Sequence, residues 1–356
     1  MVKSKILFFL QDSVGGAERM TVLLGKLLPS NLYDVTFCLI EKNSKTSIRD
    51  FIPDRYPICI IPNAGPLRVM WQLFRVIYRE HPHVVFSSVM YLNTKILLFR
   101  SFFQKIRFVV RCENYLYSFN KRQRLQIKYT YHRADAVIAQ TDEMSEELIE
   151  QMHINKEKVY VFQNPVDKEL IDRFVIEGDN PYPQNGKKHF VASGRFAYQK
   201  GFDMLMEAFI IVANKRDDVD IYILGDTEAE DGKVYKQLLS MAKKNNVDNL
   251  LYFVGYQKNP YPFIKYADCF VLSSRWEGLP NVLVEALYLG TPVAAFKCIP
   301  IIERIVSEEE NGFLAEKNDI LGLSEAMVNS LSLGRVKSTY NSSNVNDFID
   351  VICGTI

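Results

Sequence analysis

The chain has 356 residues, 48% of them apolar and 24% charged, which suits about two globular domains with ordinary cores. Its six cysteines show no CxxC pair or other metal-ligand spacing, which favours buried thiols in a reducing compartment over metal or redox roles. The apolar run at residues 6–10 is too short for a signal peptide, and no stretch reaches the roughly 18 apolar residues of a membrane helix. We therefore expect a cytoplasmic protein that meets a membrane, if at all, only as a peripheral protein at its inner face.

Charge is unevenly distributed along the chain, although the whole molecule carries only +1. Residues 1–165 hold 23 basic and 15 acidic side chains, a net charge of +8, so residues 166–356 carry −7. Such asymmetry between the two halves indicates an anionic partner for the first half.

The first half alternates strand and helix patterns. Short apolar or β-branched runs predict strands at residues 5–10, 34–40, 84–88, 107–111, 136–139 and 158–162. Apolar residues at helical spacing predict helices at 17–28, 67–80 and 142–151, the last with Thr141 as its N-cap. Dense turn chemistry within residues 166–188 predicts the connection between two domains.

The same alternation begins again after residue 188. We predict strands at 189–193, 220–225, 250–255, 267–273 and 293–295, with helices at 201–215, 231–245 and 280–289. Alternating strands and helices form parallel sheets from βαβ units, so two such sets predict two doubly wound α/β domains. Ligands of these folds bind beyond the carboxyl ends of the strands.

The first segment that could take part in binding or chemistry is residues 12–19, which join the first predicted strand to the first predicted helix. Its paired Gly15 and Gly16 let backbone N–H groups approach a ligand, and the helix N-terminus adds positive potential. The segment departs from GxGxxG, which disfavours an ordinary dinucleotide site. It predicts a loop for an anion or sugar diphosphate, although a plain glycine turn explains the residues equally well.

The second segment is the turn that opens the second domain. Arg195 and Lys200 stand five residues apart, between Gly194 and Gly201. A guanidinium fork and an ammonium both suit phosphate oxygens, and together they can neutralise a leaving pyrophosphate without a metal. Two solvated surface cations would show the same spacing.

The third segment carries two glutamates eight residues apart. Glu277 lies in a loop and Glu285 about two turns into the predicted helix, so both can face one ligand and accept hydrogen bonds from sugar hydroxyls. Backbone N–H groups after Gly278 can cap a phosphate. Apolar residues surround Glu285 along this helix, which disfavours a solvated position and makes a partner necessary.

Taken in order, these segments resemble glycosyltransferase family 4, the retaining enzymes with the GT-B fold that build bacterial surface polysaccharide and lipid-linked glycans. The resemblance covers nearly the whole chain, and the ordered series is far more specific than any single motif. It comprises the loop at 15–19, Asn164 to Asp167, Gly194-Arg195 with Lys200-Gly201, Gly255 with Asn259-Pro260, residues 267–274, Glu277 with Glu285, and Gly290-Thr291-Pro292.

The resemblance implies two Rossmann-like domains facing across a cleft. Residues 1–165 would form the acceptor-side domain, with a last helix at 336–356 packing back on it, and residues 166–335 would bind the nucleotide sugar. The donor is expected to be a UDP-sugar first and a GDP-sugar next, with no metal or other cofactor and no nucleic acid as partner. The acceptor is expected to be a glycan or lipid-linked saccharide.

The same resemblance assigns roles to individual residues. Arg195 and Lys200 would hold the donor diphosphate, Glu277 the donor sugar and Glu285 the ribose. The whole donor-binding set would be Gly15, Gly16, Gly194, Arg195, Lys200, Tyr256, Glu277, Gly278, Leu279, Pro280, Asn281 and Glu285. The catalytic set would be Glu277, Arg195, Lys200 and Glu113.

Two stretches depart from the family pattern. Many members carry a histidine after a strand of the first domain, where this chain reads Arg111-Cys112-Glu113-Asn114. Glu113 or Asn114 is therefore the candidate for its work. The segment after Gly290-Thr291-Pro292 reads Cys298-Ile299-Pro300-Ile301-Ile302-Glu303 in place of a glycine-proline step before a glutamate, which predicts altered acceptor or donor-sugar contacts.

Other chemical motifs carry less weight. Asp218 and Asp220 spell a DxD metal motif, but they begin a strand away from the expected cleft. His81, His83 and His132 lack partners at ligand spacing and are interpreted as surface or helix-end residues.

Residues 95–133 combine ten basic side chains and one acid with interleaved aromatic residues, which include Phe99, Phe102, Phe103, Tyr115, Tyr117, Phe119, Tyr129 and Tyr131. This composition is typical of a surface for anionic lipid headgroups, although nucleic acid attracts it too and a solvated face with buried rings also fits. With the family resemblance it favours a membrane surface, and Lys121, Arg122 and Arg124 are the candidate contacts.

The sequence thus predicts a retaining hexosyl- or N-acetylhexosaminyltransferase. Two alternatives stay open: a nucleotide-sugar epimerase of the same fold, and a non-catalytic subunit that binds nucleotide sugar or membrane beside a catalytic partner.

Overall fold

The computed structural model describes residues 3–42, 46–228 and 232–354. It divides into two compact units. Unit 1 is Met1–Pro165 with Ser342–Ile356, and unit 2 is Val166–Asn341. Each unit contains one parallel sheet covered by helices, which confirms the predicted α/β class.

Unit 1 is built on a seven-stranded sheet of order β3-β2-β1-β4-β5-β6-β7. Its strands are β1 (Ser4–Asp12), β2 (Tyr33–Glu41), β3 (Ile58–Ile61), β4 (Val84–Ser87), β5 (Arg107–Arg111), β6 (Ala136–Ala139) and β7 (Val159–Val161). Its helices are α1 (Gly16–Lys26), α2 (Pro66–Glu80), α3 (Met90–Leu97), α4 (Lys121–Thr130), α5 (Asp142–Glu150) and α13 (Val345–Cys353).

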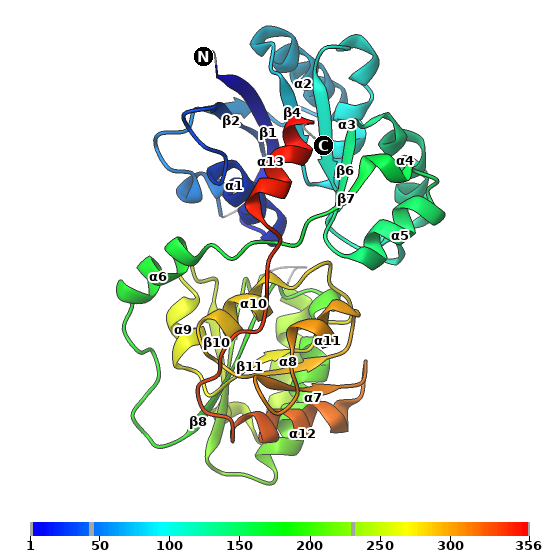
Figure 1. Ribbon diagram of the computed structural model, residues 1–356. Helices are drawn as coiled ribbons and strands as arrows, with labels where there is room; N and C mark the ends of the chain where they lie inside the picture. The colour runs from blue at the N-terminus through cyan, green and yellow to red at the C-terminus, as the bar shows by residue number, and fades with distance from the viewer. Residues whose placement is uncertain (1–2, 43–45, 229–231, 355–356) are drawn as a thin grey trace. The chain divides into compact units, whose positions relative to one another are not determined.

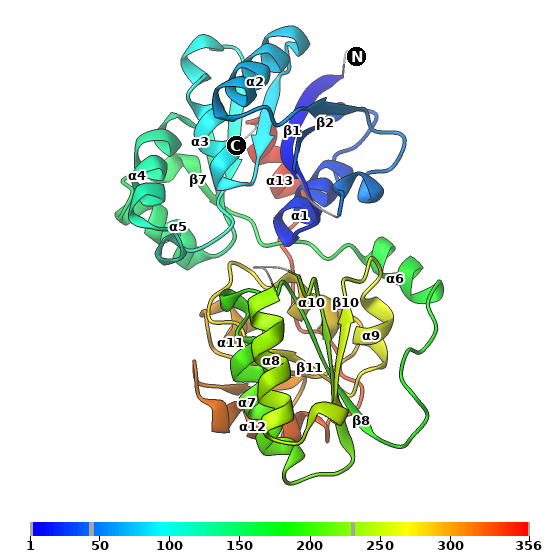
Figure 2. The ribbon, with the colours of Figure 1, turned by 180° about the vertical axis from the view of Figure 1, so that it is seen from behind.

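The strand order reverses direction beside β1, and this reversal decides which face each helix covers. Right-handed crossovers place α1 on one face, and α2, α3, α4 and α5 on the other. Figures 1 and 2 show α13 and α2 on opposite sides of this sheet. The helix α5 begins as predicted, because the Thr141 side chain accepts a hydrogen bond from the Met144 N–H at 3.2 Å.

The core of unit 1 joins residues from both ends of the chain. Ile6, Phe8 and Leu10 of β1 alternate onto the face that also holds buried side chains of α1 and α13. Phe348 of α13 is fully buried, with its ring centroid 5.8 Å from that of Phe86 and 5.2 Å from that of Phe162. The last helix is therefore an integral part of unit 1.

Unit 2 is built on a six-stranded sheet of order β10-β9-β8-β11-β12-β13. Its strands are β8 (Lys188–Ser193), β9 (Val219–Leu224), β10 (Leu251–Gly255), β11 (Cys269–Leu272), β12 (Val293–Phe296) and β13 (Gly312–Ala315). Its helices are α6 (Lys168–Ile176), α7 (Phe202–Ala213), α8 (Lys233–Lys244), α9 (Tyr261–Tyr266), α10 (Asn281–Tyr288), α11 (Ile301–Ile305) and α12 (Ile320–Ser330).

Each sheet has a switch point where successive strands depart in opposite directions. In unit 1 it lies between β1 and β4, and in unit 2 between β8 and β11. Crossover helices leave the two strands toward opposite faces there, so a crevice opens beyond their carboxyl ends. The loops that follow β1, β8 and β11 are therefore the places where each unit can receive a ligand.

Two helix predictions differ from the structure. The last helix was expected to fill residues 336–356, but residues 336–341 belong to unit 2, where the Val336 N–H donates to the Gly290 carbonyl and the Thr339 hydroxyl pairs with Asn311. The polar run 341–344 delays the helix until Asn344 caps it at Val345. The connection at 166–188 contains α6, which Asp167 caps. The start predicted at residue 231 for α8 lies outside the described residues.

Within the described residues, no helix is both long and apolar enough to cross a membrane.

The packing of α13 predicts that Phe348→Ala destabilises unit 1 by about 3–5 kcal/mol, the usual cost of removing a buried phenylalanine ring. Urea unfolding followed by circular dichroism measures this change. Asp347→Ala, at the neighbouring exposed position, is the matched control and should change stability by less than about 0.5 kcal/mol. Equal stability of the two variants would contradict the packing described.

Candidate functional site

The two loops at the switch point of unit 2 face each other because the strands that precede them are neighbours. β8 pairs with β11 in parallel, with Phe190 opposite Cys269 and Val191 opposite Phe270. The loop at 194–201 follows β8 and the loop at 273–280 follows β11. Both loops leave the carboxyl edge of the sheet, where α/β folds bind ligands.

A buried ion pair joins these two loops. The Nζ of Lys200 lies 2.6 Å from Oε1 of Glu277, and the two side chains are 17% and 8% exposed. The hydroxyl of Ser274 donates to the same Oε1 at 2.6 Å. Glu277 is thus held by a cation from one loop and a hydroxyl from its own, which fixes the position of a carboxylate that burial would otherwise make costly.

The backbone of the two loops is also joined. The Ser273 hydroxyl donates to the Lys200 carbonyl at 2.9 Å, and the Arg275 N–H donates to the Gln199 carbonyl at 2.8 Å. The Gln199 side chain in turn donates to the Trp276 carbonyl at 3.0 Å. These bonds hold the ion pair in a preorganised setting.

Arg275 anchors its loop to the start of α7. Its guanidinium makes two hydrogen bonds to Asp203, at 2.8 and 2.6 Å, and lies 3.9 Å from the centroid of the Tyr198 ring. Burial alone would raise the pKa of the Asp203 carboxyl, but the hydrogen bonds and charge of Arg275 outweigh it and lower that pKa. Such a bidentate pair adds geometric precision to the loop.

Two glycines allow the close approach of these segments. Gly201 adopts φ +62°, and a Cβ there would clash with the Ser273 carbonyl. Gly225, which follows β9, adopts φ +153°, and a Cβ there would clash with the Gly194 carbonyl. Any larger residue at either position would push apart loops that must touch.

The remaining predicted residues of unit 2 lie in the same two loops, at the start of α10 and after β10. Arg195 is exposed, and its guanidinium reaches the Gln199 side chain at 3.3 Å. Gly278, Leu279 and Pro280 are buried and lead into α10, and Asn281 is its first residue. Tyr256, which follows Gly255 at the end of β10, is 41% exposed.

Glu285 lies in α10 and is partly exposed. Its Oε1 accepts a hydrogen bond from the Tyr261 hydroxyl at 3.4 Å. The apolar neighbours in α10 point into the core at Leu283, Val284, Ala286 and Leu287. The structure therefore ties Glu277 to Lys200, and Glu285 to α9.

Cys298, in the stretch that departs from the family pattern, is buried close to this centre. Burial, reinforced by the negative charge of Glu277, raises the pKa of its thiol to about 12. The thiol is therefore neutral near pH 7 and does not offer a thiolate nucleophile.

In unit 1, the loop with Gly15 and Gly16 follows β1, and Gly15 precedes the first turn of α1. Asp12 at the end of β1 is buried and is held by Arg49 at 2.6 Å and by the Ser47 hydroxyl at 2.6 Å. Thr21 of α1 is hydrogen-bonded to Ser88 beyond β4. The glycine loop is thus fastened at the switch point of its sheet.

Glu113 lies in a turn that buried polar side chains hold in place. Gln140 donates to the Cys112 carbonyl at 3.1 Å and accepts from Asn164 at 3.1 Å, while the Asn164 side chain also accepts from Arg111. Asn93 donates to the Arg111 carbonyl at 2.9 Å. Glu113 itself is partly exposed.

The cationic helix α4 belongs to the helical layer of unit 1. Lys121 and Arg122 are exposed, whereas Arg124 is partly buried and donates to the Phe119 carbonyl at 2.9 Å. The helix also exposes Leu125 and Tyr129, at 52% and 63%. Asn120 and Gln123 close its N-terminus as a capping box.

Several residues that organise the site carried no role in the sequence prediction. Ser274 lies three residues from its partner Glu277. The partners of Arg275 and Gln199 are 72 and 77 residues away in the chain. Only the pairing of β8 with β11 reveals them. The sequence feature that pointed to this loop was the run of polar side chains between Gly194 and Gly201.

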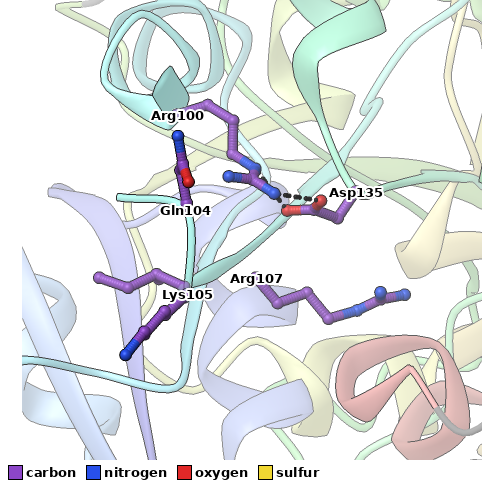
Figure 3. A pocket seen from close by; sticks show the side chains of 6 residues that line it. Arg100, Gln104, Lys105, Arg107 and Asp135 are labelled. Atoms are coloured by element: carbon purple, nitrogen blue, oxygen red, sulfur yellow. Dashed lines mark hydrogen bonds and ion pairs between the residues drawn. The ribbon is translucent and has the colours of Figure 1, made fainter. Parts of the chain in front are cut away.

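A cavity of about 180 Å³ lies at the opposite edge of the sheet of unit 1. Arg100, Gln104, Lys105, Ile106, Arg107 and Asp135 line it. Figure 3 shows Arg100 pointing to Asp135, and their charged groups form two hydrogen bonds at 2.9 and 2.8 Å. Because the cavity borders the amino ends of β5 and β6, it is separate from the loops at the carboxyl edge.

The DxD pair does not converge on a site. Asp218 is bonded to Arg216, whereas Asp220 is buried and lies 2.6 Å from Nδ1 of His189. Residues two apart in a strand share a face, so strand geometry does not separate these two carboxylates. Their different partners keep them apart. In the described ranges, no group of three His, Cys, Asp or Glu side chains could hold a metal ion.

Comparison with known proteins agrees with this architecture. Residues 14–170 match the family described as Glycosyltransferase Family 4, and residues 179–341 match Glycosyl transferases group 1. Two Rossmann-like units with these matches define a glycosyltransferase of the GT-B fold. The two matched segments together span most of the chain, and they confirm the resemblance to glycosyltransferase family 4 and the enzyme class predicted from the motifs.

Individual relatives support the same class. An uncharacterized glycosyltransferase of Methanocaldococcus jannaschii is 34% identical over 177 residues, which are 49% of this chain and 42% of the relative. The N-acetylgalactosamine-N,N'-diacetylbacillosaminyl-diphospho-undecaprenol 4-alpha-N-acetylgalactosaminyltransferase of Campylobacter jejuni is 24% identical, over 92% of this chain and 90% of the relative. The structure of Anabaena HepE in complex with UDP-glucose superposes with a TM-score of 0.76 at 18% identity, covering 99% of this chain and 98% of HepE.

The close approach at Gly201 predicts that Gly201→Ala destabilises unit 2 by more than the roughly 1–2 kcal/mol that a left-handed conformation costs a residue with a Cβ. Gly186→Ala is the matched control, because Gly186 adopts φ +77° with no atom within 4 Å of the added Cβ. Thermal unfolding of both variants measures the difference. Equal losses would show that the loops do not press on Gly201.

Proposed function

We propose that this glycosyltransferase transfers a hexosyl or N-acetylhexosaminyl group from a UDP-sugar to a glycan or lipid-linked saccharide, with retention at the anomeric carbon. The observation that carries the proposal is the Lys200–Glu277 pair, buried at the switch point of unit 2. It offers a cation for a diphosphate beside a carboxylate for sugar hydroxyls.

In the proposed reaction the bond from the anomeric carbon to the β-phosphate oxygen breaks, and a bond from that carbon to the acceptor oxygen forms. UDP leaves with the bonding electrons. The acceptor proton passes to the departing phosphate on the same face of the sugar, which accounts for retention. Lys200 and Arg195 stabilise the charge that develops on the phosphate, a contact typically worth about 10²–10³ in rate.

The other predicted residues take supporting roles in this proposal. Glu277 orients the donor sugar, Glu285 binds the ribose, and Tyr256 lies near the base. The backbone of Gly278, Leu279, Pro280 and Asn281 meets the phosphates at the start of α10. Gly194 allows the diphosphate to approach the first loop, while Gly15, Gly16 and Glu113 contribute from unit 1.

Two relatives support the choice of substrates. The complex of HepE contains UDP-glucose, and the Campylobacter enzyme acts on a saccharide attached to diphospho-undecaprenol. An acceptor on a lipid carrier also explains why unit 1 carries the positive charge of the chain, because such a carrier lies at an anionic membrane surface. We accordingly propose that Lys121, Arg122 and Arg124 of α4 meet that surface.

The donor proposal predicts that UDP raises the melting temperature of the wild type and fails to raise that of Lys200→Ala or Glu285→Ala. At about 100 times its dissociation constant, UDP should add roughly 2.7 kcal/mol to stability. The thermal shifts given by guanosine, adenosine, cytidine and thymidine diphosphates are measured in the same way. Comparison with UDP shows which base the site prefers.

Lys188→Ala is the control for this experiment. Lys188 also forms an ion pair, 2.9 Å from Asp268, but at the amino end of β8 and so at the far edge of the same sheet. This variant should retain the full UDP response. A UDP thermal shift in Lys200→Ala as large as that of the wild type would contradict the assignment of Lys200 to the donor site.

Release of UDP from UDP-sugar separates the proposed transferase from the two alternatives. A transferase releases UDP in proportion to acceptor, an epimerase converts the donor with no acceptor, and a binding subunit does neither. Wild type and Glu277→Gln are compared with a panel of lipid-linked saccharides. We expect acceptor-dependent release by the wild type and a loss of at least about 10²-fold in Glu277→Gln.

The proposed role of α4 predicts that charge reversal by Lys121→Glu/Arg122→Glu/Arg124→Glu weakens co-sedimentation with anionic liposomes. Replacing three favourable charges, each worth about 1 kcal/mol near such a surface, should lower binding by more than tenfold. Raising the salt concentration should weaken the wild type in the same way. Liposome binding that depends neither on lipid charge nor on these substitutions would exclude the proposed contact of α4 with the membrane.

A further inference from the structure

Helix α2 carries two apolar stripes, and only one of them faces the core. Val69, Leu73, Val76 and Ile77 are buried against the sheet side of the unit. Leu67, Trp71, Phe74 and Tyr78 follow the spacing i, i+4, i+7 and i+11, which places them on one line along the helix. Of these, Leu67 is 82% exposed, Trp71 64% and Tyr78 62%.

The rings of the outer stripe form a continuous stack. The centroids of Trp71 and Phe74 lie 6.0 Å apart at 14°, and those of Phe74 and Tyr78 lie 6.3 Å apart at 10°. Phe102, from the short helix η2 (Arg100–Phe102), packs edge-on against Phe74 at 5.9 Å and is 72% exposed. Leu67, Trp71, Phe74, Tyr78 and Phe102 together are called the aromatic ridge.

This arrangement is preorganised for contact with something outside the chain. A surface helix normally presents polar residues opposite its core stripe. Here Phe74 supports its neighbours on both sides, so the exposed rings are held in fixed positions. A group of large apolar side chains held in this way marks an interaction surface.

The ridge is surrounded by positive charge. Arg68, Arg75 and Arg79 lie on the same helix, and exposed Lys105 follows η2. The one acid in α2, Glu80, is bonded to Lys5 at 2.5 Å and to Arg79 at 2.7 Å. Over residues 66–133 the chain has 13 basic and two acidic side chains, a net charge of +11.

The same helical layer continues this composition across α3 and α4. These helices, with Leu98 directly after α3, expose Tyr91, Leu98, Leu125 and Tyr129 among their basic residues. Crossover handedness puts α2, α3 and α4 on one face of the sheet, away from α1. The ridge is the most exposed apolar part of this layer.

Charge decides between the possible occupants of the ridge. A second copy of this chain placed face to face would bring two sets of arginines together with no acids to pair them. Single-stranded nucleic acid uses aromatic side chains as open stacking platforms, whereas Trp71, Phe74 and Tyr78 already stack on one another. Aliphatic and aromatic side chains among Arg and Lys suit the interface of an anionic bilayer, where tryptophan and tyrosine rings sit at headgroup level.

We propose that the aromatic ridge inserts into the headgroup region of an anionic membrane, with Arg68, Arg75, Arg79 and Lys105 contacting lipid phosphates. The inference deepens the proposed function, since it rests on an acceptor that is attached to lipid. Insertion by the ridge would hold unit 1 at the depth where such an acceptor lies. The cavity beside η2, with Arg100, Lys105 and Arg107 against a single Asp135, adds to the positive field at this border.

The chain offers a direct probe of this insertion, because its only tryptophans are Trp71 and Trp276. The Trp276→Phe variant leaves Trp71 as the single reporter and is used only for fluorescence. It is mixed with vesicles of phosphatidylglycerol and phosphatidylethanolamine, or of phosphatidylcholine alone, with bromine on the acyl chains. We expect a blue shift and quenching of Trp71 emission with the anionic vesicles only.

Vesicle flotation of the full chain measures the contribution of the ridge to affinity. Leu67→Ser/Phe102→Ser keeps every charge and Trp71, and should bind anionic vesicles at least about tenfold more weakly. Ile176→Ser/Leu321→Ser is the matched control, since these unit 2 side chains are 85% and 63% exposed. The control should bind as the wild type does.

Four results would overturn the inference: no binding of the wild type to anionic vesicles, equal binding by the ridge variant, a response of Trp71 to a single-stranded oligonucleotide but not to vesicles, or a change of oligomeric state in the ridge variant alone. UDP thermal shifts on the same preparations keep the two proposals distinguishable. Absence of vesicle binding by the wild type, together with an intact UDP response, rejects the ridge and leaves the donor site standing. The reverse outcome rejects the donor site and leaves the ridge.

Discussion

The contact on which the site depends is the ion pair between Lys200 and Glu277. Both charges are largely removed from water, so each offsets part of the desolvation cost of the other. Ser274 supplies a further hydrogen bond to the carboxylate. Buried pairs of this kind contribute little net stability, because desolvation offsets most of the attraction. What the pair provides is geometry: it joins the loops after β8 and β11 at the switch point of unit 2.

The rest of unit 2 serves that geometry. Gly201 and Gly225 have no Cβ where the backbone segments touch, and Arg275 locks the second loop to the beginning of α7 through Asp203. Helix α10 begins directly after this loop, so its N-terminal backbone groups and the ion pair border the same edge of the sheet. Preorganised charges at such an edge are the usual means by which proteins stabilise a leaving phosphate.

Much of this could be predicted from the sequence, for identifiable reasons. Continuous apolar runs such as Ile6–Leu10 predict buried parallel strands, and glycines beside charged residues predict loops at their ends. The partners of Lys200 could not be predicted, because Glu277 is 77 residues away and comes near only when β8 pairs with β11. The outer stripe of α2 also went unnoticed, since a helix apolar on two sides has the pattern of one that is buried on both. The basic residues of α4 pointed to the helical layer that also contains α2, but periodicity alone does not distinguish a core ring from an exposed one.

The return of α13 to unit 1 makes the order of synthesis and the order of folding different. Unit 2 is a continuous segment and has all its residues once position 341 has been made, whereas unit 1 lacks Phe348 until after that point. The ribosome therefore delivers the first unit incomplete, with the core around Phe86 and Phe162 open while the whole of the second unit is produced. A single later segment thus controls when unit 1 reaches its final stability, and a truncation that removes α13 damages the part of the protein that was made first.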